Sequence, residues 1–160
     1  MSDTIDTLVR LRAGHDDAKS MVIDPERRLS YRELDITTRN LAAAFIDAGV
    51  LKGTRVGLIM PNGVRWVQIA LALTRIGAVL VPLSTLLPSR ELVAQLRTAS
   101  VQVLISVEGF RGHRYLDDLR SALGVTDLSG TLQCPDLPAL RQVWADDRLP
   151  DVAAAESLTR

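Results

Sequence analysis

Arg111, His113 and Arg114 lie in one short loop that also carries two glycines. The stretch EGFRGHR, residues 108–114, follows a predicted strand and leads into a predicted helix. Glycines let a backbone approach a ligand closely, and the planar fork of arginine fits phosphate oxygens. The loop is therefore a candidate phosphate site. The alternative is that these arginines are simply solvated, as most surface arginines are.

A second candidate is the loop from Ser84 to Leu87, which leaves the carboxyl end of the apolar run AVLVPL. Ligands of open α/β sheets tend to lie beyond the carboxyl ends of the strands, so Ser84 and Thr85 are candidates for contacting a ligand. The alternative is that Pro82 and Pro88 merely bracket a tight connection.

Other reactive residue types lack the patterns that chemistry requires. His15 and His113 are far apart, and neither has metal-ligand spacing around it. No serine lies in a G-x-S-x-G context, which argues against a serine nucleophile. The single cysteine, Cys134, cannot form an internal disulfide. The sequence thus predicts no catalytic residue and no metal site.

Helical and strand patterns alternate along the chain at short intervals. Ser30 followed by Glu33 is a capping-box pattern that starts a helix, and Asn62 is the predicted N-cap of the next one. Before them, residues 20–31 predict two extended pieces around an Asp24-Pro25 turn. Further strands are predicted at 54–60, 78–83 and 101–106, with a final edge strand within 137–144.

This alternation favours right-handed βαβ crossovers and an α/β fold. We expect three layers, with a mostly parallel sheet and helices on both of its faces. The apolar run at 78–83 predicts a strand covered on both sides, so Val79 and Val81 should be buried. The pattern weakens after Ser106, so we expect a single domain over 1–160 whose last part, 121–160, is a less regular tail.

Composition excludes several classes of protein. Nineteen basic residues balance nineteen acidic ones, so no long-range field draws the chain to nucleic acid or to an anionic membrane. No apolar run approaches the roughly 18 residues that a transmembrane helix needs. The first twenty residues lack the apolar core of a signal peptide, which favours a cytoplasmic protein. Seventeen arginines against two lysines suggest a bacterial source.

Several ordered blocks resemble the start of the adenylate-forming enzymes, in particular the acyl-CoA synthetases. The blocks are LSYREL at 29–34, GVLKGTRVGLIMPNGVRWVQIALALTRIGAVLVPL at 49–83 and the strand VLIS at 103–106. The resemblance covers about residues 20–120. It implies the N-terminal part of that superfamily's large domain, in which 78–83 would be a central strand.

The resemblance implies a two-step ligase that uses ATP, Mg²⁺ and coenzyme A. A carboxylate such as a fatty acid attacks ATP to form an acyl-adenylate, and the thiol of coenzyme A then displaces AMP. The motifs expected for this chemistry do not occur in the chain: a phosphate loop ending in Pro-Lys-Gly, Tyr-Gly-x-Thr-Glu, Thr-Gly-Asp and a C-terminal lid with its lysine. We therefore expect no catalysis from the 160 residues alone.

Site residues follow from the same resemblance. Acetyl-type members carry a Gly-x-Arg-x-Gly-Arg loop after the equivalent strand, and it contacts the nucleotide phosphate of coenzyme A. Arg111 and Arg114 keep the Arg-x-x-Arg spacing, whereas His113 stands in place of the second glycine. The resemblance thus assigns Arg111 and Arg114 to the coenzyme A phosphate, and Ser84 and Thr85 to a coenzyme A or acyl channel.

Three hypotheses of function stay open from the sequence. The chain is the inactive N-terminal fragment of an acyl-CoA synthetase, a stand-alone module that binds coenzyme A or a nucleotide, or a protein-interaction module. An open sheet edge and open apolar faces predict a homodimer. The alternative is that the tail, with Leu137, Leu140, Val143 and Trp144, folds back over the open face.

Overall fold

The computed structural model describes residues 4–149, which form two compact units. The first unit contains residues 4–53 and 62–78, and the second contains 54–61 and 79–149. Within residues 4–149 the chain therefore crosses between the units three times.

The first unit consists of three helices and a β-hairpin. Its elements are α1 (Ile5–His15), β1 (Ser20–Ile23), β2 (Arg28–Ser30), α2 (Tyr31–Asp47) and α3 (Val64–Arg75). Strands β1 and β2 pair antiparallel around the predicted turn, in which the N–H of Asp24 donates to the carbonyl of Arg27 at 3.0 Å.

The predicted capping box of α2 is confirmed. The hydroxyl of Ser30 accepts the N–H of Glu33 at 3.2 Å, and the Glu33 carboxylate accepts the N–H of Ser30 at 2.8 Å. The backbone hydrogen bond from Ser30 is the main reason why the pKa of Glu33 lies below its usual value. Two backbone donors that would otherwise be unpaired are thus satisfied locally.

The predicted N-cap of α3, Asn62, is wrong. Gly63 occupies the N-cap position, and the Asp24 carboxylate accepts the N–H of Val64 at 2.8 Å. The cap is therefore supplied from the β1–β2 turn, 40 residues away in the sequence. A Cβ on residue 63 would lie 3.2 Å from Oδ2 of Asp24, so glycine leaves the room that this cap uses.

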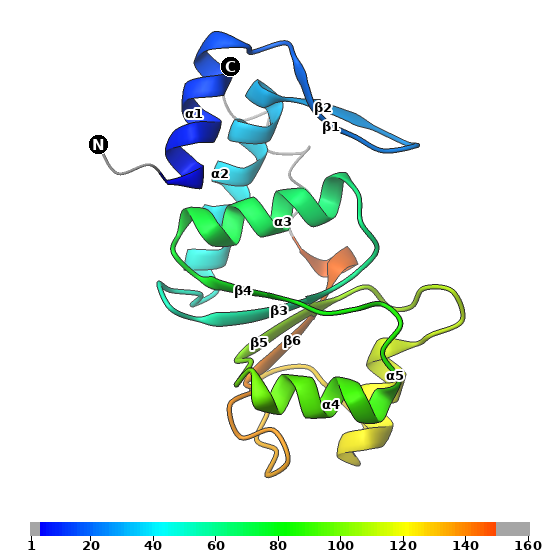
Figure 1. Ribbon diagram of the computed structural model, residues 1–160. Coiled ribbons are helices and arrows are strands. Elements are labelled where there is room, and N and C mark those ends of the chain that lie inside the picture. The colour runs from blue at the N-terminus through cyan, green and yellow to red at the C-terminus, as the bar shows by residue number, and fades with distance from the viewer. Residues whose placement is uncertain (1–3, 150–160) are drawn as a thin grey trace. The chain divides into compact units, whose positions relative to one another are not determined.

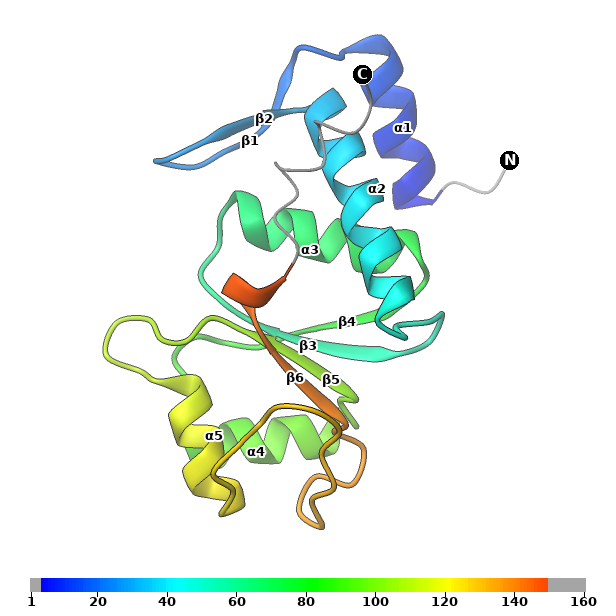
Figure 2. The same ribbon diagram turned by 180° about the vertical axis from the view of Figure 1, so that it is seen from behind.

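The second unit is built on a four-stranded sheet in the order β4-β3-β5-β6, in which all pairs are parallel. The strands are β3 (Arg55–Ile59), β4 (Val79–Pro82), β5 (Val103–Ser106) and β6 (Gln142–Ala145), accompanied by α4 (Ser89–Thr98), α5 (Tyr115–Leu123) and the short 3₁₀ helix η1 (Asp146–Arg148). The parallel α/β fold and the final edge strand are confirmed, and Figure 2 shows β6 running beside β5.

The prediction for the strand at 78–83 is wrong in one respect. Within the described residues β4 is an edge strand of the sheet and not a central one. Val79 is 45% exposed and Val81 is only half-buried, whereas β5 is buried at every position. An apolar run favours a strand, but its place in the sheet depends on how the crossovers order the strands.

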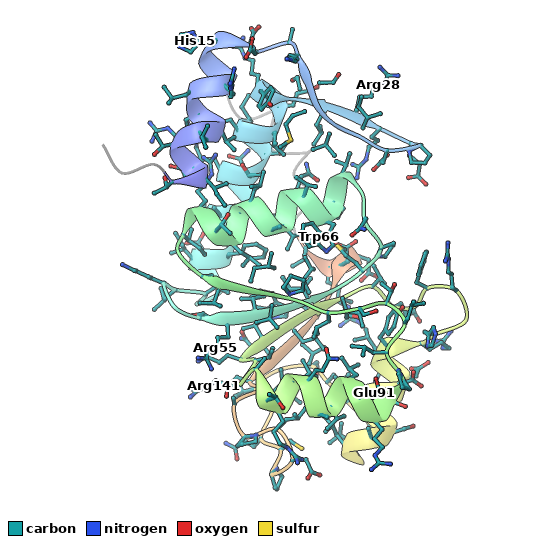
Figure 3. The ribbon with its side chains drawn as sticks, in the orientation of Figure 1. His15, Arg28, Arg55, Trp66, Glu91 and Arg141 are labelled. Carbon is teal, nitrogen blue, oxygen red and sulfur yellow. The ribbon has the colours of Figure 1, made fainter. Side chains whose placement is uncertain are left out.

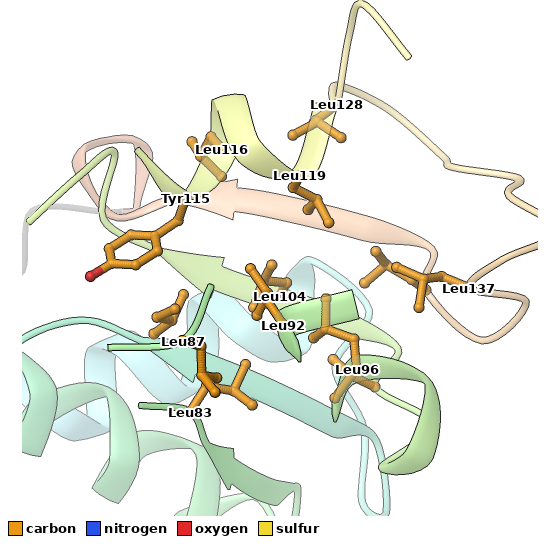
Figure 4. Close-up of a cluster of buried hydrophobic side chains, with 13 residues drawn as sticks. Leu83, Leu87, Leu92, Leu96, Leu104, Tyr115, Leu116, Leu119, Leu128 and Leu137 are labelled. Atoms are coloured by element: carbon orange, nitrogen blue, oxygen red, sulfur yellow. The ribbon is translucent and has the colours of Figure 1, made fainter. Parts of the chain in front are cut away.

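Leucines from helices, strands and the tail fill one side of this sheet. Leu92 and Leu96 of α4 and Leu119 of α5 meet Leu104 of β5 in a single buried cluster, shown in Figure 4. The tail contributes three further buried leucines to the same cluster, namely Leu128, Leu137 and Leu140. Part of the predicted tail therefore belongs to the core of the second unit.

Candidate functional site

The two candidate loops emerge at the same edge of the sheet. The segment 83–87 follows β4, and the segment 107–114 follows β5. Because the strands are parallel, their carboxyl ends lie at one edge, and Figures 1 and 2 show both loops leaving it on the same side. The fold thus brings together residues that are about 25 positions apart in the sequence.

A tight hairpin forms the outer part of the second loop. Phe110 and His113 exchange two backbone hydrogen bonds, of 2.9 and 3.0 Å. Between them Arg111 and Gly112 both have positive φ, 50° and 85°, as in the type I′ turns of two-residue hairpins. At Gly109 an added Cβ would lie 2.5 Å from the carbonyl oxygen of His113. Both glycines are therefore explained by the hairpin itself, whether or not a ligand approaches.

Arg111 stands at the tip of this hairpin. Its guanidinium carbon lies 5.2 Å from the centroid of the Phe110 ring, in a cation–π contact. The side chain is exposed, and within residues 4–149 no carboxylate pairs with it. Its five donors are thus available to an anion.

Arg114 is held differently. Its guanidinium donates to the Asp117 carboxylate and lies 3.1 Å from that of Glu108. The bond to Asp117 is the first reason why the pKa of Arg114 is raised and that of Asp117 lowered. Arg114 therefore links the base of the loop to the first turn of α5. A phosphate bound at Arg114 would share its guanidinium with the carboxylates of Glu108 and Asp117.

Tyr115 connects the two loops and was not singled out in the sequence. Its hydroxyl donates to the carbonyl oxygen of Thr85 at 2.7 Å, and its ring stacks on His113 with 5.9 Å between centroids. Burial raises the pKa of Tyr115, so the phenol stays a neutral donor. The one available signal was general: a tyrosine buried at the start of a helix needs a partner for its hydroxyl.

The first loop is a short hydrogen-bonded turn. The hydroxyl of Ser84 accepts the N–H of Leu86 at 3.2 Å, and its carbonyl accepts the N–H of Leu87 at 3.4 Å. Ser84 is exposed and Thr85 half-buried. The arrangement is compatible with a tight connection as well as with a ligand-facing loop.

Cations also lie elsewhere on the second unit. Arg55 at the start of β3 and Arg141 before β6 extend outward at the opposite edge of the sheet, as Figure 3 shows. Positive charge alone therefore does not distinguish the candidate site. Its distinguishing feature is that Arg111 lies at the carboxyl edge of the sheet, beside the Ser84–Leu87 loop.

The described residues contain neither a cluster of metal ligands nor a membrane-spanning helix. Among residues 4–149, no three His, Cys, Asp or Glu side chains gather as a metal ion would require. No helix within that range has the length and apolar character needed to cross a membrane.

The amino-acid sequence of this chain is similar to those of known enzymes. Residues 10–156 match the family model described as AMP-binding enzyme. The chain is 32% identical over 152 residues to the chalcone synthase cfoA of Aspergillus candidus, in a match covering 89% of this chain and 5% of that protein. It is 28% identical over 144 residues to the mitochondrial medium-chain acyl-CoA ligase of Mus musculus, covering 89% of this chain and 22% of the ligase.

Solved structures share the fold. The fatty acyl CoA synthetase of Mycobacterium tuberculosis aligns with a TM-score of 0.72 and 21% identity, over 98% of this chain and 28% of that chain. The N-terminal subdomain of NpsA from Klebsiella oxytoca aligns with a TM-score of 0.69 and 24% identity, over 92% and 32%. The chain thus spans a third or less of the length of each of these four proteins.

Proposed function

Because the chain belongs to the AMP-binding enzyme family, we propose that it is the N-terminal portion of an AMP-forming acyl-CoA ligase. The similarity to the mouse medium-chain acyl-CoA ligase, of which the match covers 22%, supports the proposal. In that longer enzyme, residues 1–160 would form part of a larger α/β domain. Its substrate would be a fatty acid or another small carboxylate. The source would be bacterial, as the arginine-rich composition suggests, and the location would be the cytoplasm.

The reaction of the longer enzyme would proceed in two transfers. A carboxylate oxygen attacks the α-phosphorus of ATP, which gives the acyl-adenylate and releases pyrophosphate. The sulfur of coenzyme A then attacks the acyl carbon, and AMP leaves as the thiol proton is lost. Mg²⁺ would accompany ATP, and no residue of this chain is assigned to either group.

The role proposed for this chain is to bind coenzyme A. Arg111 would bind the nucleotide phosphate of coenzyme A, and Ser84 and Thr85 would line the channel beside it. One observation carries this assignment: no carboxylate among residues 4–149 pairs with Arg111, whose loop emerges beside the Ser84–Leu87 loop at the carboxyl edge of the sheet. Arg114 would be a second donor of smaller effect, because Glu108 and Asp117 already share its charge.

Calorimetric titration tests the assignment. The wild-type chain should bind coenzyme A more tightly than dephospho-coenzyme A, which lacks the ribose phosphate. Arg111→Ala should lower the affinity for coenzyme A most of the way to that for the dephospho form, since Arg114 would keep a smaller contact with the phosphate. Arg141→Ala is the matched control, since Arg141 lies at the opposite edge of the sheet and should leave binding unchanged. If millimolar coenzyme A produced neither heat nor a shift in melting temperature, the proposed coenzyme A site would be contradicted.

Catalysis is a separate part of the proposal. Incubation of the 160-residue chain with ATP, Mg²⁺, a fatty acid and coenzyme A should yield neither AMP nor a thioester. Formation of AMP above the level of a boiled control would contradict the proposed inactivity. Binding of coenzyme A without turnover is expected both for a fragment of a ligase and for the alternative, a stand-alone binding module. The reading frame of the gene distinguishes these two hypotheses.

A protein-interaction role has its own supporting observation. Large apolar side chains of α1 and β1 are exposed in the first unit: Ile5, Leu8, Leu11, Met21 and Ile23. Ile5, Leu8 and Met21 also line, with Tyr31 and Leu71, a hollow of about 250 Å³. Exposed apolar patches commonly mark interfaces, and a twofold dimer is the commonest way to cover one. We therefore include a homodimer through this surface in the proposal.

A further inference from the structure

Tyr115 is anchored more firmly than the loop whose carbonyl it binds. The residue is 1% exposed, and its ring lies at the margin of the leucine cluster beside Leu87, as Figure 4 shows. It is the first residue of α5, which is held to the core through Leu116 and Leu119. Its hydroxyl therefore occupies a place defined by the core of the second unit.

The Ser84–Leu87 loop has few other attachments. Within the loop, the only hydrogen bonds of the described residues are those that Ser84 accepts from Leu86 and Leu87. The side chain of Leu87 is buried, but that of Leu86 is 67% exposed. The bond from Tyr115 is thus the polar contact that ties the middle of this loop to a neighbouring segment.

The hairpin beside it keeps its own shape. The two backbone bonds between Phe110 and His113 close the turn that carries Arg111, and neither involves Tyr115. Loss of the tyrosine hydroxyl should consequently release one loop and leave the other folded.

We propose that Tyr115 is a positioning residue, whose hydroxyl latches Thr85 to the Arg111 hairpin so that both loops present a single surface to coenzyme A. The inference rests on the proposed function for its ligand, but the latch itself is a property of the two loops. Tyr115 would touch no ligand atom and would act through Ser84 and Thr85.

Hydrogen exchange tests the latch without any ligand. In Tyr115→Phe the ring still fills its place, and only the bond to Thr85 is removed. The amides of Leu86 and Leu87 should then exchange about 3- to 10-fold faster, the factor that one net hydrogen bond represents. The amides of Phe110 and His113 should exchange as in the wild type. Tyr31→Phe, in the first unit, is the matched control and should change neither loop.

A uniform acceleration over the whole second unit would show that Tyr115 only stabilises the fold, and unchanged rates at Leu86 and Leu87 would show that no latch exists. Either result overturns the inference. If Tyr115→Phe failed to fold, the wild type would decide: addition of coenzyme A should slow exchange at both loops together, and protection of the hairpin alone would count against a shared surface.

A double-mutant cycle tests the positioning role. If the latch aligns the loop with Arg111, Tyr115→Phe and Arg111→Ala should each weaken coenzyme A binding, and the double variant should lose less than the product of the two factors. Strictly multiplicative losses, or unaltered binding by Tyr115→Phe, would overturn it. Failure of the wild type to bind coenzyme A would instead contradict the proposed function. The exchange rates would still decide whether the latch exists.

Discussion

Arg75 and Asp35 form an ion pair in which both side chains are only 11% exposed, with 2.7 Å between Nη2 and Oδ1. Arg75 belongs to α3 and Asp35 to α2, and Nε of Arg75 also lies 3.2 Å from the carboxylate of Asp6 on α1. The guanidinium of Arg75 thus links α3 to both α1 and α2.

Arg75→Met should destabilise the chain by about 3–5 kcal/mol, because it removes the buried cation that Asp35 and Asp6 share. Each of the two carboxylates then keeps only an exposed arginine as its partner. Urea denaturation followed by circular dichroism measures the loss. The control is Arg39→Ala: Arg39 also pairs with Asp35, but its side chain is 61% exposed, so its loss should be below about 1 kcal/mol. Equal losses for the two variants would show that burial does not set the strength of this network.

Ser30→Ala should cost about 0.5–2 kcal/mol by opening the capping box of α2. Part of the effect depends on pH, because the Ser30 hydroxyl also donates to the Glu33 carboxylate at 2.8 Å, and this bond is the second cause of the lowered pKa of Glu33. A lowered pKa means that the stabilisation is complete above the ordinary pKa of a glutamate and is lost as the pH falls through the folded value. The difference in melting temperature between Ser30→Ala and wild type should therefore be largest near pH 7 and shrink below about pH 4. A difference that is constant from pH 7 to pH 3 would argue against a charged cap.

Asp24→Ala should lower the melting temperature, since the carboxylate accepts the N–H groups of Val64, Glu26 and Arg27. The hydrogen bond from Val64 is the first cause of its lowered pKa, so this contribution too is present at neutral pH and disappears as the pH falls through the folded value. Glu26→Ala, in the same turn, is the matched control and should have little effect. Equal melting temperatures for the two variants would mean that the cap of α3 is unimportant.

Val79→Asp should be tolerated, with a loss of about 1 kcal/mol or less, because β4 lies at the sheet edge and Val79 is 45% exposed. Leu104→Asp, in the buried strand β5, should abolish cooperative unfolding, since it places an unpaired charge in the leucine cluster. Thermal melts of the two variants give the comparison directly. An unfolded Val79→Asp protein would restore the interpretation of β4 as a covered strand.

The proposed dimer should appear in analytical ultracentrifugation as a concentration-dependent increase in mass. Leu8→Glu should make the chain monomeric, because Leu8 lies in the exposed apolar surface of α1 and β1. Leu51→Glu, also exposed in the first unit but outside that surface, should leave association unchanged.

A version ending at Leu119 supplies a second test of association. It lacks Leu128, Leu137 and Leu140 and should expose the leucine cluster, so it should associate more strongly than the full chain. A full chain that stays monomeric while only the shorter version associates would contradict the dimer and leave the tail as the cover of the core.

Much of the local structure could be predicted from the sequence because its causes lie within a few residues. The capping box needs only Ser30 and Glu33, and the alternation of apolar runs with helical patterns was sufficient for a parallel α/β fold. The ordered blocks between residues 29 and 106 pointed to the family that residues 10–156 match. The two candidate loops were found in the same way, since each directly follows a predicted strand.

The tertiary structure decided what depends on partners distant in the sequence. Asp24 caps α3 in place of Asn62, and β4 lies at the sheet edge although its composition is that of a buried strand. At the candidate site, Arg114 is paired with Glu108 and Asp117. No carboxylate of the described residues pairs with Arg111, so the two arginines differ in their availability to an anion. The bond from Tyr115 to Thr85 spans 30 positions in the sequence and forms only because parallel strands deliver both segments to one edge of the sheet. Periodicity and short motifs specify which residues face a core, but which side chains meet there is determined by the packing of the whole unit.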